Sequence, residues 1–296
     1  MSGGGEPHLS GVLPASLVLV GAGKMGASLI EGWLAAGLRP DGVAVIDPRA
    51  SAEVRDLCAR HGIALRSGAD GVAAPEVMVL AVKPQALAEV APALRDLAGP
   101  GTLILSILAG KTLADLRAAL PRAGAFVRAM PNLPASIGRG ATGAVASPEV
   151  SPAQRAAADT LLASVGAAEW VNSEGLIDAV TALSGSGPAY VFHLAECLAE
   201  AGRQAGLPAD LAARLARATV SGAGELMARS DLSADRLREA VTSPGGTTAA
   251  ALDVLMGGEP GQGALERLMV EAVAAAKRRA GELSGGLPSR GELPTR

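Results

Sequence analysis

The chain has 296 residues, of which 49% are hydrophobic but only 2% are aromatic, and its formal net charge is −3. This length allows one large domain or two medium ones, with interiors built mainly from alanine, valine and leucine. The slightly negative charge, without a dense run of lysine or arginine, argues against nucleic acid or an anionic membrane as a partner.

Cysteine usage and hydropathy restrict the class of protein further. Cys58 and Cys197 lie far apart in the sequence, with neither C-x-x-C spacing nor nearby histidine ligands, so we expect no metal site and a cytoplasmic location. Glycine or a charged residue interrupts every apolar run before it reaches membrane-spanning length. The segments 1–14 and 284–296 are expected to be disordered tails, and the first lacks the basic region of a signal peptide.

The stretch Leu17–Gly26, LVLVGAGKMG, organises the first half of the chain. Four apolar residues run directly into a G-x-G-x-x-G spacing that stands between an expected strand and an expected helix. In such a turn Gly21 permits the tight bend, Gly23 lets a pyrophosphate approach the backbone, and Gly26 lets the helix pack on the sheet. We therefore expect a dinucleotide site at the start of this helix, where free N–H groups favour negative charge.

Alternating strands and helices follow this turn. We expect strands at 17–20, 43–46, 63–65, 77–82, 103–105 and 125–128, and helices at 24–36, 51–61 and 112–120. Two edge strands at 141–146 and 167–171 are expected around a helix at 153–165. This pattern predicts a Rossmann-type α/β domain over residues 15–172.

Three polar side chains follow strands of this expected sheet, where ligands of open parallel sheets collect. Asp47 stands about twenty residues past the glycine turn and can accept from the ribose hydroxyls of NAD, or it can serve only the turn before Pro48. Arg49 and the more distant Arg55 can instead meet the 2′-phosphate of NADP, which leaves the choice of coenzyme open. Lys83 is either a coenzyme neighbour or a solvated lysine. Asn132 can bind a carboxamide such as that of nicotinamide or satisfy its own turn.

Helical patterns replace strand patterns from about residue 173. We expect helices at 189–205, 209–229, 234–241, 248–256 and 265–283, and hence an all-helical domain over residues 173–283. Two Ser/Gly-rich breaks precede helices in this half. For Ser184–Pro188 ordinary helix capping is the preferred interpretation, whereas Thr242–Thr248 has more threonine, serine, proline and glycine than a cap requires, which favours a carboxylate-binding loop.

The chemistry implied by these features is a hydride transfer. A dinucleotide turn and an anion-binding loop occur without a nucleophile elbow, a P-loop or a local Cys/His pairing. Reduction of a polarised C=N bond needs little proton management from the protein, because the cofactor performs the difficult step.

Four longer strings resemble pyrroline-5-carboxylate reductases, the enzymes that complete proline biosynthesis. They are AVKPQ at 81–85, RAMPNLPASIGRGATG at 128–143, DAVTALSGSGPAY at 178–190 and LREAVTSPGGTTAAAL at 237–252, and the similarity runs in order from about Leu17 to Leu283. The resemblance implies NAD(P)H-dependent reduction of 1-pyrroline-5-carboxylate to L-proline. It also implies a helical domain for substrate binding and dimerisation, in homodimers that assemble into a homodecamer.

The resemblance also implies roles for individual residues. Coenzyme-binding positions are Val20, Gly21, Ala22, Gly23, Lys24, Met25, Gly26, Asp47, Pro48, Ala81, Val82, Lys83, Pro84, Ala109 and Asn132. Substrate-binding positions are Glu174, Ser243, Gly245, Gly246, Thr247 and Thr248. Thr248 also matches the threonine whose hydroxyl lies near the ring nitrogen, which makes it the expected catalytic residue.

Two departures from the family pattern concern the coenzyme. Asp47 would repel a 2′-phosphate, which puts a preference for NADPH in doubt, and the loop Ser67–Ala69 lacks an asparagine often found there.

Another two-domain reductase is the nearest alternative function, acting on a β-hydroxy acid or a different cyclic imine. Such enzymes usually carry a catalytic lysine on a central helix, and Asp178–Arg229 contains none. The second alternative is not an enzyme but a redox sensor that binds a dinucleotide and reports to a partner. Such a sensor would have no need for the Ser243–Thr248 loop.

Overall fold

The computed structural model describes residues 12–257 and 263–285, so most of both expected tails lies outside the described residues. The chain divides into two compact units: an N-terminal unit, Met1–Gly185 with Lys277–Arg296, and a helical unit, Ser186–Ala276. The last helix, α11 (Ala264–Leu283), begins in the helical unit and ends in the N-terminal unit. The domain limits expected at 15–172 and 173–283 stay a prediction.

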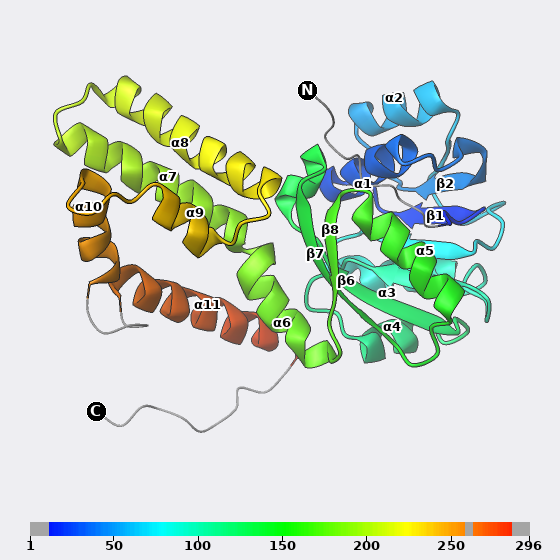
Figure 1. The fold of residues 1–296 in the computed structure, drawn as a ribbon. Helices are drawn as coiled ribbons and strands as arrows, with labels where there is room; N and C mark the ends of the chain where they lie inside the picture. Colours follow the sequence, from blue (N-terminus) through cyan, green and yellow to red (C-terminus); the bar gives the residue numbers. More distant parts are fainter. Residues whose placement is uncertain (1–11, 258–262, 286–296) are drawn as a thin grey trace. The chain divides into compact units, whose positions relative to one another are not determined.

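The N-terminal unit is built on one eight-stranded sheet, with the order β3-β2-β1-β4-β5-β6-β7-β8 (Figure 1). β1 to β6 run parallel, β7 is antiparallel to β6, and β8 is parallel to β7. The order reverses between β1 and β4, which is the switch point of a doubly wound sheet and confirms the Rossmann-type fold. The strands are β1 (Leu17–Val20), β2 (Val43–Ile46), β3 (Ala64–Arg66), β4 (Val77–Leu80), β5 (Leu103–Ser106), β6 (Ala125–Met130), β7 (Gly140–Ala146) and β8 (Gly166–Trp170).

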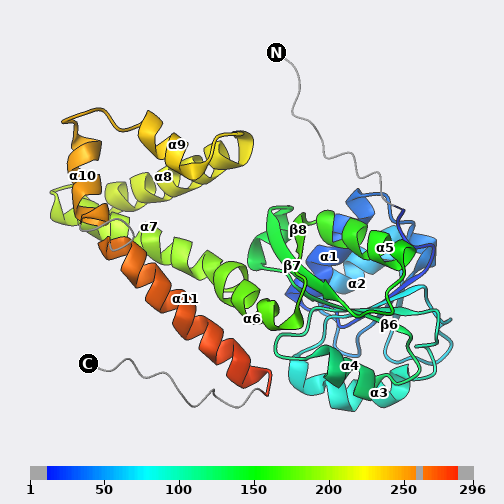
Figure 2. The ribbon, with the colours of Figure 1, turned by 60° about the horizontal axis from the view of Figure 1, so that its bottom comes forward.

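Helices cover both faces of this sheet, as Figure 2 shows. On one face lie α1 (Lys24–Ala35), α2 (Ala52–His61) and α5 (Pro152–Ala163); on the other lie α3 (Leu87–Leu94) and α4 (Leu113–Ala119). One hydrophobic core contains Leu29, Leu57 and Leu161 from the first group of helices. A second core contains Leu87 and Leu116 from the other group. The central strands are therefore buried on both sides, as continuous apolar strands of a parallel sheet require.

The remaining elements are helical, and those after residue 173 agree with the change of pattern expected there. They are η1 (Pro40–Gly42), η2 (Pro84–Ala86), η3 (Leu133–Ile137), η4 (Glu174–Leu176), α6 (Ile177–Val180), the π-helical turn η5 (Thr181–Gly185), α7 (Gly187–Gln204), α8 (Ala209–Arg229), α9 (Ala234–Ala240) and α10 (Thr247–Met256). Helix α3 was not predicted. None of the helices in the described residues has the length and hydropathy needed to cross a membrane.

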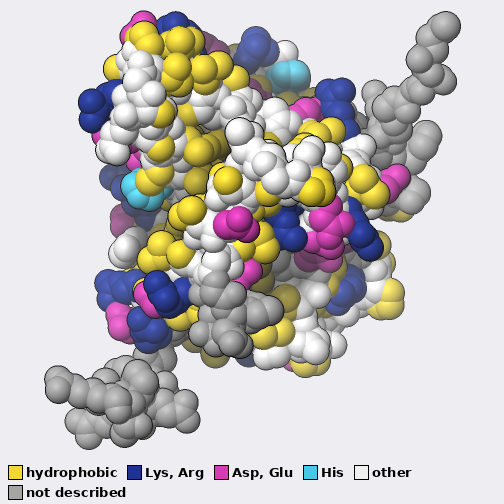
Figure 3. All heavy atoms as spheres, turned by 60° about the vertical axis from the view of Figure 1, so that its left-hand side comes forward, with side chains coloured by type: hydrophobic (Ala, Val, Ile, Leu, Met, Phe, Trp, Pro, Cys, Tyr) yellow, Lys and Arg dark blue, Asp and Glu magenta, His cyan; other side chains and the backbone are white. Residues whose placement is uncertain are grey.

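The helical unit buries little apolar surface within one chain. Among its described residues the buried hydrophobic side chains are only Ala212 and Ala216, where α7 and α8 pack together. Figure 3 shows hydrophobic side chains gathered on the surface of the helices. Large exposed members on α7, α8, α10 and α11 are Val191, Phe192, Leu194, Leu198, Leu215, Leu226, Met227, Val254, Leu255, Leu268, Met269 and Val270. So much exposed apolar surface is typical of a protein–protein interface.

Candidate functional site

The glycine turn after β1 has the close backbone approaches that the sequence predicts. Gly21 has φ +89° and its N–H donates to the Ile46 carbonyl at 2.9 Å. A Cβ on Gly21 would lie 2.8 Å from the Val82 backbone, and one on Gly26 would lie 2.5 Å from the Gly21 carbonyl oxygen. Gly23, the N-cap of α1, instead faces open space, because a Cβ there would meet no other part of the chain within 4 Å. Of these three glycines, only Gly23 leaves room for a ligand.

A cavity of about 450 Å³ lies at the carboxyl ends of β1, β2 and β4, against α3. It is lined by Val20, Gly21, Gly23, Ile46, Asp47, Pro48, Arg49, Ser67, Gly68, Ala69, Ala81, Val82, Lys83, Ala86, Glu89, Val90, Ala93 and Leu94. Eight predicted coenzyme residues are in this lining: Val20, Gly21, Gly23, Asp47, Pro48, Ala81, Val82 and Lys83. The open space at Gly23 and the amides at the start of α1 fit a dinucleotide pyrophosphate.

Helix α3 forms the cavity wall that sequence analysis missed. Its residues Leu87, Ala91 and Leu94 are buried with helical spacing, but Pro92 inside the helix and Pro84 before it concealed this signal. Pro92 removes one N–H from the last turn of this eight-residue helix, which is held instead by the burial of Leu87, Ala91 and Leu94 in the core. The spacing of the three apolar residues was the available indication of this helix.

Asp47 is half-buried at the end of β2, and backbone N–H groups hold both of its carboxylate oxygens. Its Oδ2 accepts from the Ala22 N–H and its Oδ1 accepts from the Arg49 N–H, each at 2.8 Å. The first bond ties β2 to the glycine turn. Asp47 therefore has the structural role in its own turn that the sequence suggests as one alternative, and the residue also lines the cavity.

The other predicted coenzyme residues lie around the same turn or farther along the sheet edge. Ala22 is buried and donates to Asp47, while Lys24, Met25 and Gly26 form the first turn of α1. Pro84 begins η2 directly after Lys83, and Ala109 is exposed in the turn after β5. None of these is in the cavity lining above, so their coenzyme contacts stay a prediction.

Asn132 is 8% exposed, and both ends of its side-chain amide are used within the protein. The Nδ2 group donates to the Ser184 carbonyl at 3.0 Å, and Oδ1 accepts from the Ala141 N–H at 2.9 Å. A Cβ on neighbouring Gly185 would lie 2.9 Å from Met130 Cε. These contacts hold the π-helical turn η5 to the loop after β6, so Asn132 has the turn-satisfying role considered from the sequence. Its predicted contact with nicotinamide stays untested.

Glu174 lies in a partly buried ionic cluster of the N-terminal unit. Arg128, whose side chain is only 5% exposed, lies 3.1 Å from Glu174 and 3.7 Å from Asp178. The same Glu174 oxygen accepts from the Leu113 N–H at 2.7 Å, and Ser284 donates to Asp178 at 3.3 Å. The cluster thus joins β6 to α4, α6 and the residue after α11. The buried guanidinium depends on these carboxylates, because an unpaired charge there would be strongly unfavourable.

Asp115 belongs to the capping box at the start of α4, next to this cluster. Partial burial acts to raise its pKa, but hydrogen bonds from the Thr112 N–H and hydroxyl, with Lys111 and Arg128 nearby, hold the pKa below its usual value. Asp115 is therefore charged at neutral pH and stabilises the start of the helix.

The predicted substrate loop lies in the helical unit as a tight turn before α10. The Gly246 N–H donates to the Ser243 carbonyl at 3.0 Å, and Gly245 has φ +69°, a conformation that favours glycine. Gly246 is the N-cap of α10 and provides no side-chain cap. The N–H groups of Thr247 and Thr248 therefore point away from the helix and can bind an anion. Thr248 is half-buried and Thr247 is exposed.

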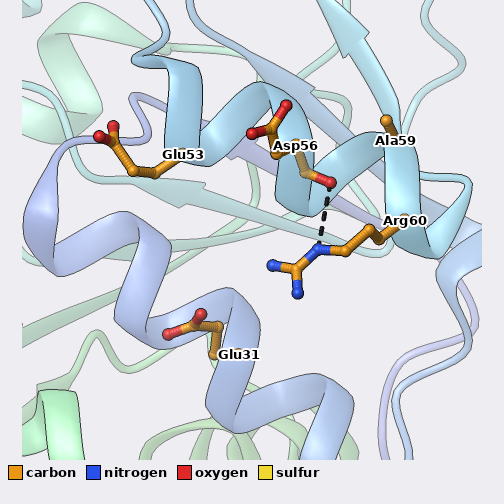
Figure 4. Close-up of a pocket in the computed structure, with 5 residues that line it drawn as sticks. All are labelled: Glu31, Glu53, Asp56, Ala59 and Arg60. Carbon is orange, nitrogen blue, oxygen red and sulfur yellow. Dashed lines mark hydrogen bonds between the residues drawn. The ribbon is translucent and has the colours of Figure 1, made fainter.

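A second hollow, between α1 and α2, does not have the chemistry of a nucleotide site. Figure 4 shows Glu31 on α1 and Glu53, Asp56 and Arg60 on α2 around it. The Arg60 Nε donates to the Asp56 carbonyl at 3.4 Å. Three carboxylates against one guanidinium disfavour an anionic ligand. The described residues contain no group of three or more His, Cys, Asp or Glu side chains that could hold a metal ion.

The chain is 40% identical over 269 residues to a pyrroline-5-carboxylate reductase of Pseudomonas aeruginosa, an alignment that covers 90% of this chain and 96% of the relative. The chain belongs to the pyrroline-5-carboxylate reductase family. A pyrroline-5-carboxylate reductase of Synechocystis is 44% identical over 212 residues, covering 70% of this chain and 75% of that relative. The resemblance inferred from the sequence is thereby confirmed.

Family models and a solved structure agree with this membership. The model for pyrroline-5-carboxylate reductase dimerisation matches residues 174–283, and the model for NADP oxidoreductase, coenzyme F420-dependent, matches residues 16–110. The structure of a pyrroline-5-carboxylate reductase from Coxiella burnetii has a TM-score of 0.84 and 36% identity, covering 92% of this chain and 99% of that chain. The family match therefore includes both the Rossmann-type sheet and the helices that follow it.

The glycine turn gives a matched pair of substitutions. Gly23→Ala should leave the melting temperature unchanged but raise the Kd for NADH at least 10-fold, because its Cβ would occupy space beside the pyrophosphate. Gly26→Ala should lower the free energy of unfolding by about 1–3 kcal/mol, because its Cβ would collide with the turn. Thermal denaturation and NADH fluorescence titration measure the two effects. Normal NADH binding by Gly23→Ala would contradict this account of the turn.

The ionic cluster predicts a stability effect at Glu174. Glu174→Gln should lower the free energy of unfolding by about 1–3 kcal/mol, because Arg128 loses a charged partner in a buried position. Glu149→Gln is the matched control: Glu149 pairs with Arg117 at 2.9 Å, but both side chains are nearly half exposed, so we expect about 0–1 kcal/mol. Urea denaturation measures both values. Equal losses in the free energy of unfolding for the two variants would show that the buried cluster stabilises the protein no more than an exposed ion pair does.

Proposed function

We propose that this chain reduces 1-pyrroline-5-carboxylate to L-proline with NAD(P)H, the final step of proline biosynthesis. The observation that carries the proposal is the 40% identity, over nearly the full length of both chains, to a pyrroline-5-carboxylate reductase. The cavity at the sheet edge and the anion-binding turn before α10 supply the two binding chemistries that this reaction needs. A family member from Plasmodium falciparum, 25% identical with a TM-score of 0.74, is described with NADP bound.

The N-terminal unit holds the coenzyme, which supplies the hydride when bound. Amides at the start of α1 bind the pyrophosphate, and Gly23 leaves space for it. Ala81, Val82 and Lys83, at the end of β4, also line the cavity. We retain the full predicted coenzyme set, including the residues outside the cavity lining, as part of this proposal.

The turn Ser243–Thr248 holds the substrate carboxylate. The unpaired N–H groups of the first turn of α10 are anion donors, and the hydroxyls of Ser243 and Thr247 add further donors. Gly245 and Gly246 keep the backbone accessible to the ligand. Glu174 completes the proposed set through the exposed part of its side chain, which is 31% accessible, in addition to its bond with Arg128.

Thr248 is the proposed catalytic residue because its half-buried hydroxyl stands at the same turn. The hydroxyl orients the ring nitrogen by a hydrogen bond and relays to it a proton taken up from solvent water, so that the hydroxyl itself stays protonated and the neighbouring carbon becomes more electrophilic. The backbone around Thr248 fixes the position of the hydroxyl and contributes no group that titrates. No histidine is needed for this proton step.

The assembly belongs to the same proposal. The match to the dimerisation model and the exposed apolar side chains of the helical unit support a homodimer, and we extend this to a homodecamer. We place the protein in the cytoplasm. Its cysteines are free, and burial raises the pKa of the Cys58 thiol, so this residue is protonated and inert.

Initial-rate assays test the proposed reaction. Purified protein should oxidise NADH or NADPH when given 1-pyrroline-5-carboxylate and form an equimolar amount of L-proline, measured by chromatography. Absence of turnover with both coenzymes would refute the reaction. The same assays with a β-hydroxy acid exclude the other two-domain reductases.

Removal of the Thr248 hydroxyl tests its role. Thr248→Ala should lower kcat by about 10- to 1,000-fold, because proton transfer and charge stabilisation are lost. Thr248→Ser is the control and should retain most of the activity, since it keeps a hydroxyl at the second position of α10. Steady-state kinetics give kcat and KM separately. An unchanged kcat in Thr248→Ala would show that the catalytic assignment is wrong.

The oligomer can be disrupted through the helical unit. Phe192 is 56% exposed in one chain, and Phe192→Asp should lower the molar mass measured by light scattering, because a charge would enter an apolar interface. Val12→Asp is the control: Val12 is 79% exposed and lies in the N-terminal unit, so the mass should not change. A monomeric wild-type protein would contradict the proposed assembly.

A further inference from the structure

We infer that Asp47 makes the dinucleotide site selective for NADH over NADPH, and that the selectivity comes from the way the backbone holds its carboxylate. The inference deepens the proposed function, on which it rests for the coenzyme class. Family membership leaves the choice between the two coenzymes open. They differ only at the adenosine ribose, which carries a 2′-hydroxyl in NADH and a 2′-phosphate in NADPH.

The Asp47 carboxylate is anchored from two directions. The Ala22 N–H belongs to the glycine turn after β1 and binds Oδ2, whereas the Arg49 N–H belongs to the turn after β2 and binds Oδ1. Both distances are 2.8 Å, which is typical of charge-assisted hydrogen bonds. Rotation of the side chain away from the cavity would break both bonds. A larger ligand therefore cannot displace the carboxylate without disturbing the pyrophosphate turn itself.

The anchored carboxylate suits one ribose and opposes the other. An ionised carboxylate has about four acceptor sites, so two remain after the backbone bonds are made. Ribose hydroxyls can donate to these sites, as in dinucleotide folds with an acidic residue at the end of the second strand. A 2′-phosphate carries a charge of about −1.5 to −2 and its oxygens act mainly as acceptors. NADPH would therefore lack the hydrogen bond from the ribose 2′-hydroxyl to Asp47, and its 2′-phosphate would be repelled by the Asp47 carboxylate.

The cations that line the cavity do not cancel this repulsion. Lys83 follows β4, and β1 lies between β4 and β2 in the sheet, so Lys83 and Asp47 flank the glycine turn from opposite sides. Arg49 is nearer along the chain, but its side chain is exposed. Ordering an exposed arginine costs side-chain entropy, and salt screens its charge. The fixed carboxylate of Asp47 therefore dominates.

Adenosine fragments test this inference without catalysis. Isothermal titration of the full-length protein with adenosine 5′-monophosphate and with adenosine 2′,5′-bisphosphate should give a Kd at least 10-fold lower for the monophosphate, because the two probes differ only in the 2′-phosphate of the second. In Asp47→Asn the ratio of the two Kd values should fall at least 10-fold. Asp47→Ser provides a second uncharged variant in case the asparagine disturbs the turn, and thermal denaturation checks the folding of both.

Glu89→Gln is the matched control. Glu89 lines the same cavity from α3, and its substitution removes an equal charge without touching the amides that hold Asp47. The Kd ratio should change less than 3-fold. A wild-type preference for adenosine 2′,5′-bisphosphate, or an equal change in Glu89→Gln and Asp47→Asn, would overturn the inference.

Kinetics separate this inference from the proposed reaction. The kcat/KM of the wild type with 1-pyrroline-5-carboxylate should be at least 10-fold higher for NADH than for NADPH. Higher efficiency with NADPH would overturn the inference while leaving the reaction intact. Absence of turnover together with tighter binding of adenosine 5′-monophosphate than of adenosine 2′,5′-bisphosphate would refute the reaction and still support the role of Asp47.

Discussion

The close approach of α1 to the end of β1 is the constraint on which the dinucleotide site depends. At Gly26 the backbone lies so near the Gly21 carbonyl that no side chain fits, so the helix starts directly above the sheet edge. Gly23, the N-cap of this helix, then lines the cavity. The hydrogen bond from the Ala22 N–H to Asp47 joins the end of β2 to the same glycine turn. Binding geometry here follows from backbone packing before any side-chain chemistry is considered.

Sequence patterns predicted the elements with strong local signals. The G-x-G-x-x-G turn, β2 (Val43–Ile46) and α8 (Ala209–Arg229) have the bounds expected from glycine spacing and apolar periodicity. Helix α3 was missed because its prolines outweighed an apolar spacing of only three residues. Since α3 forms a wall of the cavity, Glu89 and its neighbours could not be assigned to the site from sequence. Local rules fail where a short helix is stabilised mainly by the core on which it packs.

Side-chain partners distant in sequence were beyond the reach of pattern analysis. Asn132 donates to Ser184, 52 residues away, and Arg128 donates to Glu174, 46 residues away. Nothing near either residue in the sequence specifies these pairs, because the fold brings them together. An amide or a carboxylate at a strand end is therefore compatible with both a ligand and a structural partner. For Asn132 and Glu174 the structural partner is present, whereas Asp47 has backbone partners and also faces the cavity.

The two units distribute apolar surface very differently. The N-terminal unit buries leucines, valines and isoleucines on both faces of its sheet, so it contains two complete cores. The helical unit exposes leucine, methionine and phenylalanine side chains on several helices, and its buried apolar side chains within the described residues are two alanines. Hydrophobic burial is the main favourable term in folding, and a unit with so little of it has little stability alone. The match of residues 174–283 to the dimerisation model agrees with this distribution, because apolar side chains that one chain leaves exposed are the ones that a second chain can bury.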